Sequence, residues 1–324
     1  MLPKVPLASE SNRNAVIGRA RPISSRLRPR IRTGLKATLL GVALFMVLLP
    51  RNRLSAFAYP LLFGLPLIYA ASRRDAERAF LLWTTYAISF ATFVVLRRLA
   101  DDTGMPWLHE YVIQIDQVLG LGTVPTVALQ RMWYSVADSG ILDGATIGFH
   151  LSYYLVPPAM GIIFWSANQP VFERYLLAIA LTYLIGLLVH FLLPTVPPWM
   201  AGSSGYTEPV ARVLYDRVQT TWPSFYRFGH ALAGGNDVAA MPSLHMATAF
   251  LVALGLGRLG RVTAALGIVY ALGMGFSLVY TGEHYVIDLL GGILIAWLCW
   301  LAAPSLIAWV LPSPARVPPS RPPE

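Results

Sequence analysis

This sequence is poor in cysteine and in charged residues. Its one cysteine, Cys299, lies inside an apolar run, so no intrachain disulfide can form. Only 13% of the 324 residues are charged, about half the share of a soluble domain. Apolar residues make up 56% and the mean hydropathy is +0.56, which exceeds what one soluble core can bury. Long apolar runs between short polar stretches predict an integral membrane protein instead.

The net charge of +9 does not indicate nucleic-acid binding, because of where the basic residues lie. They concentrate in residues 1–33 and in short loops between apolar runs, as the positive-inside rule requires of membrane proteins. We predict that residues 1–33 form a disordered basic cytoplasmic tail and not a signal peptide, because no small-residue cleavage site follows. The Pro-rich residues 312–324 predict a second cytoplasmic tail.

We predict an all-α fold, a polytopic bundle of about eight transmembrane helices. Each predicted span is an apolar run near the ~17–25 residues that cross a bilayer as a helix. Two helices fall within residues 34–78, and six more form a catalytic core over residues 79–311. Pro157 and Pro158 should kink the fourth span. The predicted spans are 34–50, 54–71, 79–96, 145–166, 173–193, 241–257, 262–280 and 286–311.

The placement of Lys and Arg sets the predicted orientation. With both termini in the cytoplasm, most loop arginines fall inside and two long loops, 97–144 and 194–240, fall outside. Arg51 and Arg53 run against the rule. Loops of this length are usually functional in compact proteins.

Two segments of the first long loop, 110–121 and 125–134, mix apolar and polar residues. This pattern predicts helices that lie in the membrane interface. Glu110 and Asp116 fall on the first of them. They either bond a sugar-like acceptor or belong to a solvated polar face.

The first motif runs from Met241 to His245 (MPSLH), at the outer start of the sixth span. Proline favours the first position of a helix, and the backbone N–H groups that follow have no partner within the helix. Together with the Ser243 hydroxyl they predict an anion site. His245 beside it can protonate a leaving oxygen. The alternative is a structural helix start whose histidine reaches the headgroup layer.

The second motif runs from Tyr280 to Asp288 (YTGEHYVID) and covers the turn between the last two spans. His284 and Asp288 are four residues apart and share one helix face. A carboxylate bonded to one imidazole nitrogen leaves the other nucleophilic, and ionisable residues at this depth are functional by default. A structural His–Asp pair would have the same spacing. So would half of a metal site, but no further ligands stand out nearby.

Under the predicted topology, both motifs lie at the outer ends of adjacent spans. An anion site, a nucleophilic His284 and an acidic His245 then meet at one depth, which predicts phosphoryl transfer. His150 and His190 lie within or near spans. We expect them to be packing histidines.

The motif pair resembles that of the type 2 phosphatidic acid phosphatase superfamily, whose members carry Pro-Ser-x-His and His-x-x-x-Asp. The resemblance implies that His284 attacks phosphorus and forms a phosphohistidine held by Asp288. It further implies that His245 protonates the departing oxygen. Ser243 would bind a phosphate oxygen.

The form of the motifs is similar to one branch, the inositol phosphorylceramide synthases, which transfer a phosphoinositol headgroup between lipids. The similarity includes Gly291 and Gly292 after the second motif and the segment 193–199 (LPTVPPW) after the fifth span. It covers the predicted six-helix core, and the first two spans lie outside it.

The sequence departs from the phosphatases in two basic features. Their Arg six residues before the nucleophilic His is Leu278 here, and their Lys/Arg-Pro motif has no counterpart in the loop before the first motif. A transferring phosphate still needs cationic or N–H stabilisation. Arg227 is the predicted cation, unless it is simply solvated. These departures favour a phosphodiester donor over phosphatidic acid.

These observations predict a lipid phosphotransferase or phosphatase acting on a lipid phosphoester at the outer face of a bacterial cell membrane. The mechanism needs no cofactor and no metal. The expected partners are a membrane lipid substrate and an acceptor, either a lipid alcohol or water. A plain lipid phosphate phosphohydrolase, a metal-dependent hydrolase and a non-catalytic lipid-binding or transport protein are the alternatives. The last would need ionisable residues along the spans, whereas here they cluster at the outer face.

Overall fold

The computed structural model describes residues 77–310 except 103, 137–139 and 222–237, together with residues 64, 66, 67 and 70. The chain divides into two compact units, Met1–Leu44 and Phe45–Glu324, and all described residues lie in the second. The predicted basic tail, the span 34–50, almost all of the span 54–71, the C-terminal tail and Arg227 therefore lie outside the described residues.

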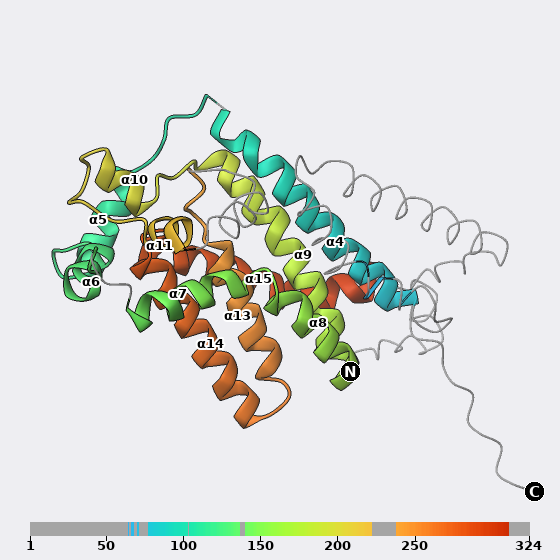
Figure 1. Cartoon of the computed structure of the whole chain (residues 1–324). Helices are drawn as coiled ribbons and strands as arrows, with labels where there is room; N and C mark the ends of the chain where they lie inside the picture. The colour runs from blue at the N-terminus through green and yellow to red at the C-terminus, as the bar shows by residue number, and fades with distance from the viewer. Residues whose placement is uncertain are drawn as a thin grey trace, which may run out of the picture. The chain divides into compact units, whose positions relative to one another are not determined.

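Every regular element of the described part is a helix, and the predicted all-α fold is confirmed. The two β-bridges found there, Leu108 with Thr195 and Thr195 with Ala239, are isolated. Six helices make up the apolar core (Figure 1). They are α4 (Glu77–Leu96), α7 (Ile141–Ser152), α8 (Val156–Ala167), α9 (Gln169–Leu192), α13 (Leu244–Leu256), α14 (Arg261–Tyr280) and α15 (Val286–Val310), with α7 and α8 counted as one broken helix.

The fourth predicted span is not one straight helix. Four helices of the described part are each long and apolar enough to cross a membrane alone: α4, α9, α14 and α15. The helices α7 and α8 are long enough only when taken together, and they meet at a bend of 58°. Pro157 and Pro158 lie in the first turn of α8, where a missing N–H costs little. The Tyr175 hydroxyl donates to the Pro157 carbonyl over 3.0 Å. The predicted kink is confirmed, but the span breaks in two.

The sixth predicted span, 241–257, is shorter than expected. α13 has 13 residues, so it extends about 20 Å, whereas the hydrocarbon core is ~30 Å thick. It starts only at Leu244 because Ser243 is its N-cap. α13 packs against α8, α9, α14 and α15, and so lies in the interior of the bundle.

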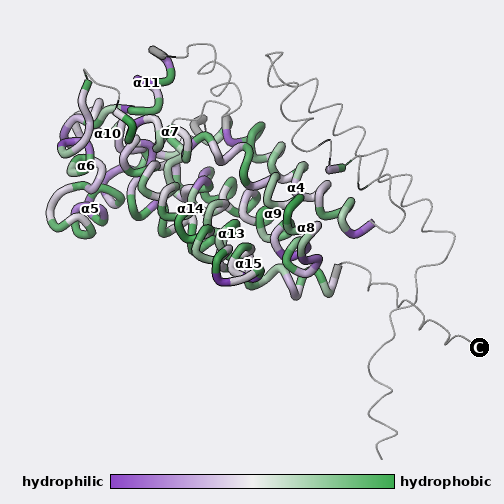
Figure 2. Tube along the Cα trace, turned by 60° about the horizontal axis from the view of Figure 1, so that its bottom comes forward, coloured by the Kyte–Doolittle hydropathy of each residue, from purple (hydrophilic) through white to green (hydrophobic). Residues whose placement is uncertain are grey.

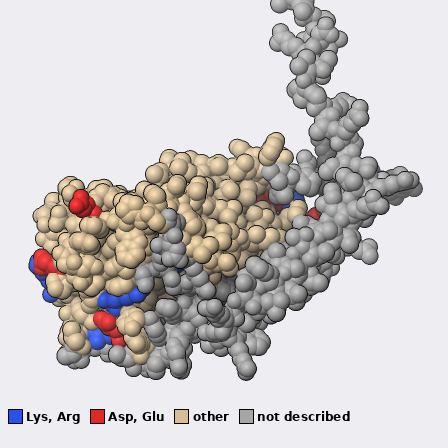
Figure 3. All heavy atoms as spheres, turned by 90° about the horizontal axis from the view of Figure 1, so that it is seen from above, with Lys and Arg blue, Asp and Glu red and all other residues tan. Residues whose placement is uncertain are grey.

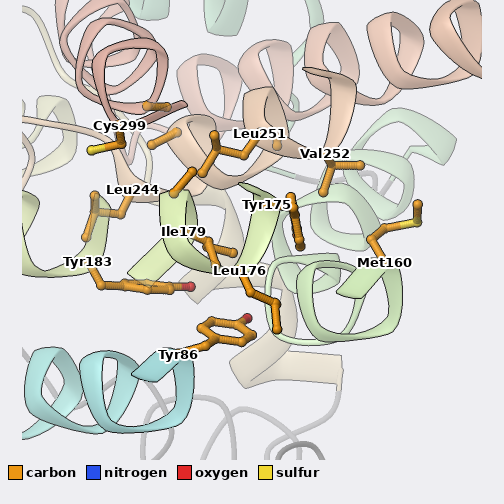
Figure 4. Packing of buried hydrophobic residues seen from close by; sticks show 14 of the residues in the cluster. Tyr86, Met160, Tyr175, Leu176, Ile179, Tyr183, Leu244, Leu251, Val252 and Cys299 are labelled. Atoms are coloured by element: carbon orange, nitrogen blue, oxygen red, sulfur yellow. The ribbon is translucent and has the colours of Figure 1, made fainter. Parts of the chain in front are cut away.

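The core of the bundle forms where α9 meets its neighbours. Tyr183 of α9 stacks on Tyr86 of α4 with 6.1 Å between ring centroids. Figure 4 shows Leu176 and Ile179 of α9 packed near Leu251 and other buried residues of the same cluster. Because α9 buries side chains on several sides, it contacts α4, α8, α13 and α15.

The remaining helices form a second layer at one end of the bundle, which we call the cap (residues 104–136 and 194–221). Figure 2 shows this end to be more hydrophilic than α9, α13 and α15. Figure 3 shows described charged residues gathered there, and none along the middle of the visible face. The cap helices are α5 (Glu110–Leu119), α6 (Pro125–Trp133), α10 (Pro198–Ser203) and α11 (Val213–Thr221); the 3-10 helix η3 (Arg97–Asp102) follows α4.

The cap has an apolar cluster of its own. Its members come from α5, from the start of α6 and from the segment after α9, and include Tyr285 of the second motif. The predicted helices at 110–121 and 125–134 are therefore present as α5 and α6, and they pack on the turn that carries His284. The buried members of the cluster are Val112, Ile113, Val124, Val127, Val196, Ala201, Val238 and Tyr285.

Candidate active site

Ser243 joins the two motifs. Its side-chain oxygen accepts the N–H of Met246 at 3.3 Å and so caps α13. Its own N–H donates to the carbonyl oxygen of Asp288 at 3.0 Å. Pro242 therefore precedes the cap, and our prediction that it occupies the first helical position is wrong. Because Ser243 is fully buried, its hydroxyl faces the interior and not the solvent.

His284 and Asp288 meet, as their spacing predicted, but they do not share a helix face, because His284 lies in the turn before α15 and only Asp288 is on the helix. The Nδ1 atom of His284 is 3.5 Å from Oδ2 of Asp288, an ion-pair distance that is long for a hydrogen bond. The same Oδ2 accepts the N–H of Tyr285 at 2.8 Å, which holds the carboxylate in place. Because Nδ1 faces the carboxylate, Nε2 is the nitrogen left for chemistry. Asp288 is completely buried and His284 is 6% exposed.

Three histidine rings lie in a row. The ring of His245 is 5.9 Å from that of His284 and 4.5 Å from that of His150, measured between centroids. Tyr153 covers His245 at 4.1 Å. Within the described part of the chain, Nδ1 of His150, Nε2 of His245 and Nδ1 of His284 are buried without a hydrogen-bond partner. Since Nδ1 of His284 faces Asp288, the nitrogens of His150 and His245 are the ones that remain for a ligand.

The two other histidines we had assigned to packing differ in their surroundings. His190 donates from Nε2 to the carbonyl oxygen of Pro242 at 3.1 Å, which suits the packing role expected of it. His150 instead lies beside His245 inside the site, with the two rings tilted by 46°. Among the described residues, no group of three or more His, Cys, Asp or Glu side chains is arranged to hold a metal ion.

The cap fastens the turn that carries the second motif. Asp116 of α5 accepts the N–H groups of Val286 and Ile287 at 2.9 and 3.0 Å. Gln130 of α6 donates to the carbonyl oxygen of Tyr280 at 2.8 Å. Asp116 is completely buried, so it lies neither on a solvated face nor at an accessible sugar site. Its position corrects both sequence interpretations.

The pKa values of two carboxyl groups around the turn are shifted in opposite directions. Burial raises the pKa of Asp116 to about 6, although its two backbone donors offset part of the rise. Burial also acts to raise the pKa of Glu283. The attraction of Arg212 and its hydrogen bond outweigh that effect, so the pKa of Glu283 is lowered. Glu283 is therefore ionised at neutral pH.

Two arginines lie within electrostatic range of the histidine row. The Nε atom of Arg212 lies 2.9 Å from a carboxylate oxygen of Glu283, the residue before His284. Arg97 begins η3, with its guanidinium 5.3 Å from the ring centre of Phe93. It lies within electrostatic range of His245. The predicted phosphate-binding Arg227 is outside the described residues.

Sequence reasoning missed Arg97 because an arginine at the end of a span normally anchors the helix at the interface. One signal was present. Arg97 and Arg98 follow the third predicted span on its outer side, where the positive-inside rule disfavours basic residues. Arginines that break the rule beside a predicted site are candidates for function.

No solved structure matches the chain. A curated relative, the phosphoinositol dihydroceramide synthase of Bacteroides thetaiotaomicron, is 29% identical over 202 aligned positions. These take in 53% of this chain and 64% of the relative, so the chain spans less than two thirds of the relative's length.

The apolar helices make the chain an integral membrane protein. The family model described as the PAP2 superfamily matches residues 110–302, a segment that includes most of the cap and both motifs. Since this segment is more than half of the 324 residues, the chain belongs to the PAP2 superfamily, as its motif pair predicted.

Proposed function

We propose that the protein is a lipid phosphotransferase that moves a phosphoinositol-type headgroup from a phosphodiester lipid to a lipid alcohol. The observation that carries the proposal is the position of His284, between the Asp288 carboxylate at 3.5 Å and the His245 ring at 5.9 Å. The printed name of the relative, a phosphoinositol dihydroceramide synthase, supports the choice of headgroup. Membership of the PAP2 superfamily supports phosphoryl transfer on a lipid.

In the first half of the reaction, Nε2 of His284 attacks phosphorus. A P–N bond forms and the P–O bond to the lipid alcohol of the donor breaks. His245 gives its proton to that departing oxygen. Asp288 stabilises the positive charge that develops on the His284 ring, through Nδ1.

In the second half, the hydroxyl of the acceptor lipid attacks phosphorus and the P–N bond breaks. The acceptor proton passes to His245, which returns to its starting state. Water in place of the acceptor would give hydrolysis by the same steps. The two outcomes differ only in which hydroxyl enters.

The charge of the transferring phosphate needs donors nearby. Ser243 at the N-terminus of α13 supplies a hydroxyl, and helix N-termini favour anions. Arg97 is the described arginine whose electrostatic field reaches both His190 and His245. We assign the cationic role to Arg97, and Arg227 is the second candidate.

The proposed site faces the outer side of the membrane, with both termini in the cytoplasm. This orientation rests on the loop arginines of residues 72–78 and 257–261. The cap would then be the outer layer. A donor lipid of the outer leaflet would reach His284 beneath it.

The decisive experiment replaces the proposed nucleophile and follows the products by mass spectrometry. Purified wild type and His284→Ala receive phosphatidylinositol with and without a ceramide acceptor. We expect a new phosphoinositol lipid from the wild type only when the acceptor is present. The variant should lose at least about 1000-fold in rate, because no other group forms the P–N bond.

His109→Ala is the matched control, since this histidine stacks on Tyr206 in the cap with 3.8 Å between ring centroids. It should retain wild-type turnover. Headgroup phosphate released without acceptor would assign a hydrolase instead. Equal products from wild type and His284→Ala would contradict the catalytic role of His284.

A further inference from the structure

A second polar cluster lies around His150, near His284. It consists of the Arg212–Glu283 ion pair, with Nε to Oε1 at 2.9 Å, and of His150. The carboxylate of Glu283 lies within electrostatic range of both His150 and His284. The cluster therefore adjoins the proposed nucleophile directly. Phosphoryl transfer as described above does not use it.

The ion pair is held in place by its neighbours but remains partly exposed. The guanidinium of Arg212 lies 4.2 Å from the ring centre of Trp199, and the side chains of Arg212 and Glu283 are 28% and 14% exposed. The backbone N–H of Trp199 donates to the carbonyl oxygen of Gly282 at 3.0 Å. Trp199, on which Arg212 lies, is therefore anchored to the turn that carries Glu283. The geometry of the pair is preorganised.

Two buried nitrogens at this cluster lack a protein partner within the described residues. They are Nδ1 of His150 and the indole Nε1 of Trp199. A buried polar atom without a partner costs roughly 1–3 kcal/mol, so it is normally satisfied by water or a ligand. Neither nitrogen takes part in the His284–Asp288 pair. They indicate hydrogen bonds completed by a bound molecule.

The chemistry of the cluster suits a ligand with several hydroxyl groups. A carboxylate accepts from hydroxyls, a guanidinium donates to them, and an imidazole can do either. A second phosphate is disfavoured, because Glu283 is ionised and would repel it. A purely apolar group would leave the charged atoms desolvated. A neutral polyol meets none of these penalties.

We infer that Arg212, Glu283 and His150 form the subsite for the hydroxyl-bearing headgroup that remains on phosphorus during transfer. This inference rests on the proposed function, because it needs a phosphodiester donor with a polyol headgroup. The subsite determines which headgroup is transferred. Its residues bind the donor and do not form or break bonds.

The test compares two phosphodiester donors of equal charge, phosphatidylinositol and phosphatidylmethanol, whose headgroup has no hydroxyl. For each donor kcat/KM is measured with the same acceptor, and the ratio of the two values reports headgroup selectivity. We expect the wild type to favour phosphatidylinositol by at least about tenfold, the usual effect of hydrogen bonds to charged groups.

Two variants change the charge or the polar atoms of the cluster with little change of shape. Glu283→Gln removes the charge, and His150→Phe keeps a ring beside His245 but removes both nitrogens. Each should lower the selectivity ratio at least about fivefold, chiefly by raising KM for phosphatidylinositol. The control is Glu208→Gln in the exposed Arg131–Glu208 ion pair of the cap, which should leave the ratio unchanged.

The outcomes separate this inference from the proposed function. Transfer from both donors at similar kcat/KM by the wild type would overturn the subsite while the transferase stands. Variants that slow both donors equally would show that the ion pair only anchors the cap, and would also overturn it. No transfer from either donor by the wild type would overturn the proposed function and the subsite together. The wild-type ratio tests the subsite even where a variant does not fold.

Discussion

At the residue scale, Asp116 lies outside the turn that carries His284 but holds that turn in position. The first N–H groups of a helix have no partner within the helix, and Asp116 accepts two of them at the start of α15. A negative charge is also favourable at a helix N-terminus. Since α15 carries Asp288 in its first turn, Asp116 holds the start of the helix that bears the partner of His284, from 170 residues away in sequence.

The raised pKa of Asp116 makes a testable contribution to stability. Its pKa goes from 3.8 to about 6 on folding, so between about pH 4 and pH 6 the folded state keeps a proton that the unfolded state has lost. The free energy of unfolding therefore falls as the pH rises through that window. We expect the melting temperature of the wild type in detergent to fall between about pH 4 and pH 6. The part of this fall that comes from Asp116 should disappear in Asp116→Asn.

Gln117→Ala, an exposed change on the same helix, serves as control and should keep the wild-type pH dependence. Identical curves for wild type and Asp116→Asn between pH 4 and pH 6 would show that Asp116 titrates normally. The comparison of curves isolates Asp116 from other carboxyl groups that titrate in the same range.

The residues found from sequence and those missed differ in the kind of information they needed. His284 and Asp288 stand four apart, and Ser243 and His245 two apart, so local spacing was sufficient to select them. Asp116 and His150 act through partners far away along the chain. Nothing in the local pattern of α5 or α7 distinguishes a residue that reaches a distant turn from one that faces solvent or packs.

At the scale of elements, the close approach of α13 and α15 depends on Gly292. A Cβ atom at this position would overlap the carbonyl oxygen of Ser243, which is backbone and cannot swing away. Gly291 is less restricted. A Cβ there would lie 3.2 Å from the terminal methyl group of Met241, a flexible side chain. The glycine pair in the sequence therefore has one strict member.

Gly292→Ala should push α15 away from the start of α13 and separate His284 from His245. We expect a loss of at least about 100-fold in kcat, since a displacement of about 1 Å can cost that much. Gly291→Ala should lose less than about threefold. Product formation by both variants, with melting temperatures alongside, checks this. Equal losses would show that Gly292 has no special role.

Helix positions were predictable from apolar runs, and helix interruptions were only partly so. The six core spans fall on helices within a few residues, apart from the starts of α7, α9 and α13 and the break between α7 and α8. The Pro157–Pro158 pair predicted a kink, but proline at the first turn of a helix is equally compatible with a new start. The late start of α13 depends on the bond from Ser243 to Asp288, which is a tertiary contact.

At the scale of the whole molecule, the orientation in the membrane determines from which leaflet the donor lipid reaches the site. Cysteine labelling can test it, because the one native cysteine, Cys299, is buried and can be replaced by alanine. Val136→Cys places a thiol in the cap, where the native side chain is 82% exposed. Ser166→Cys places one at the far end of α8, which is also exposed.

We expect a membrane-impermeant maleimide to label Val136→Cys in right-side-out vesicles and Ser166→Cys only after permeabilisation. The positive-inside rule supports this direction, with Arg73, Arg74 and Arg258 on the inner side. The reverse labelling pattern would put the cap in the cytoplasm. The donor lipid would then come from the inner leaflet.

The bond between Ser243 and Asp288 also bears on how the protein can move. α13 and α15 are joined backbone to backbone at their starts, and Gly292 keeps them in close contact there. Thermal motion that displaces one of these helices must carry the other along. We therefore expect the starts of the two helices to move together, which would keep the rings of His245 and His284 near each other while the rest of the bundle fluctuates.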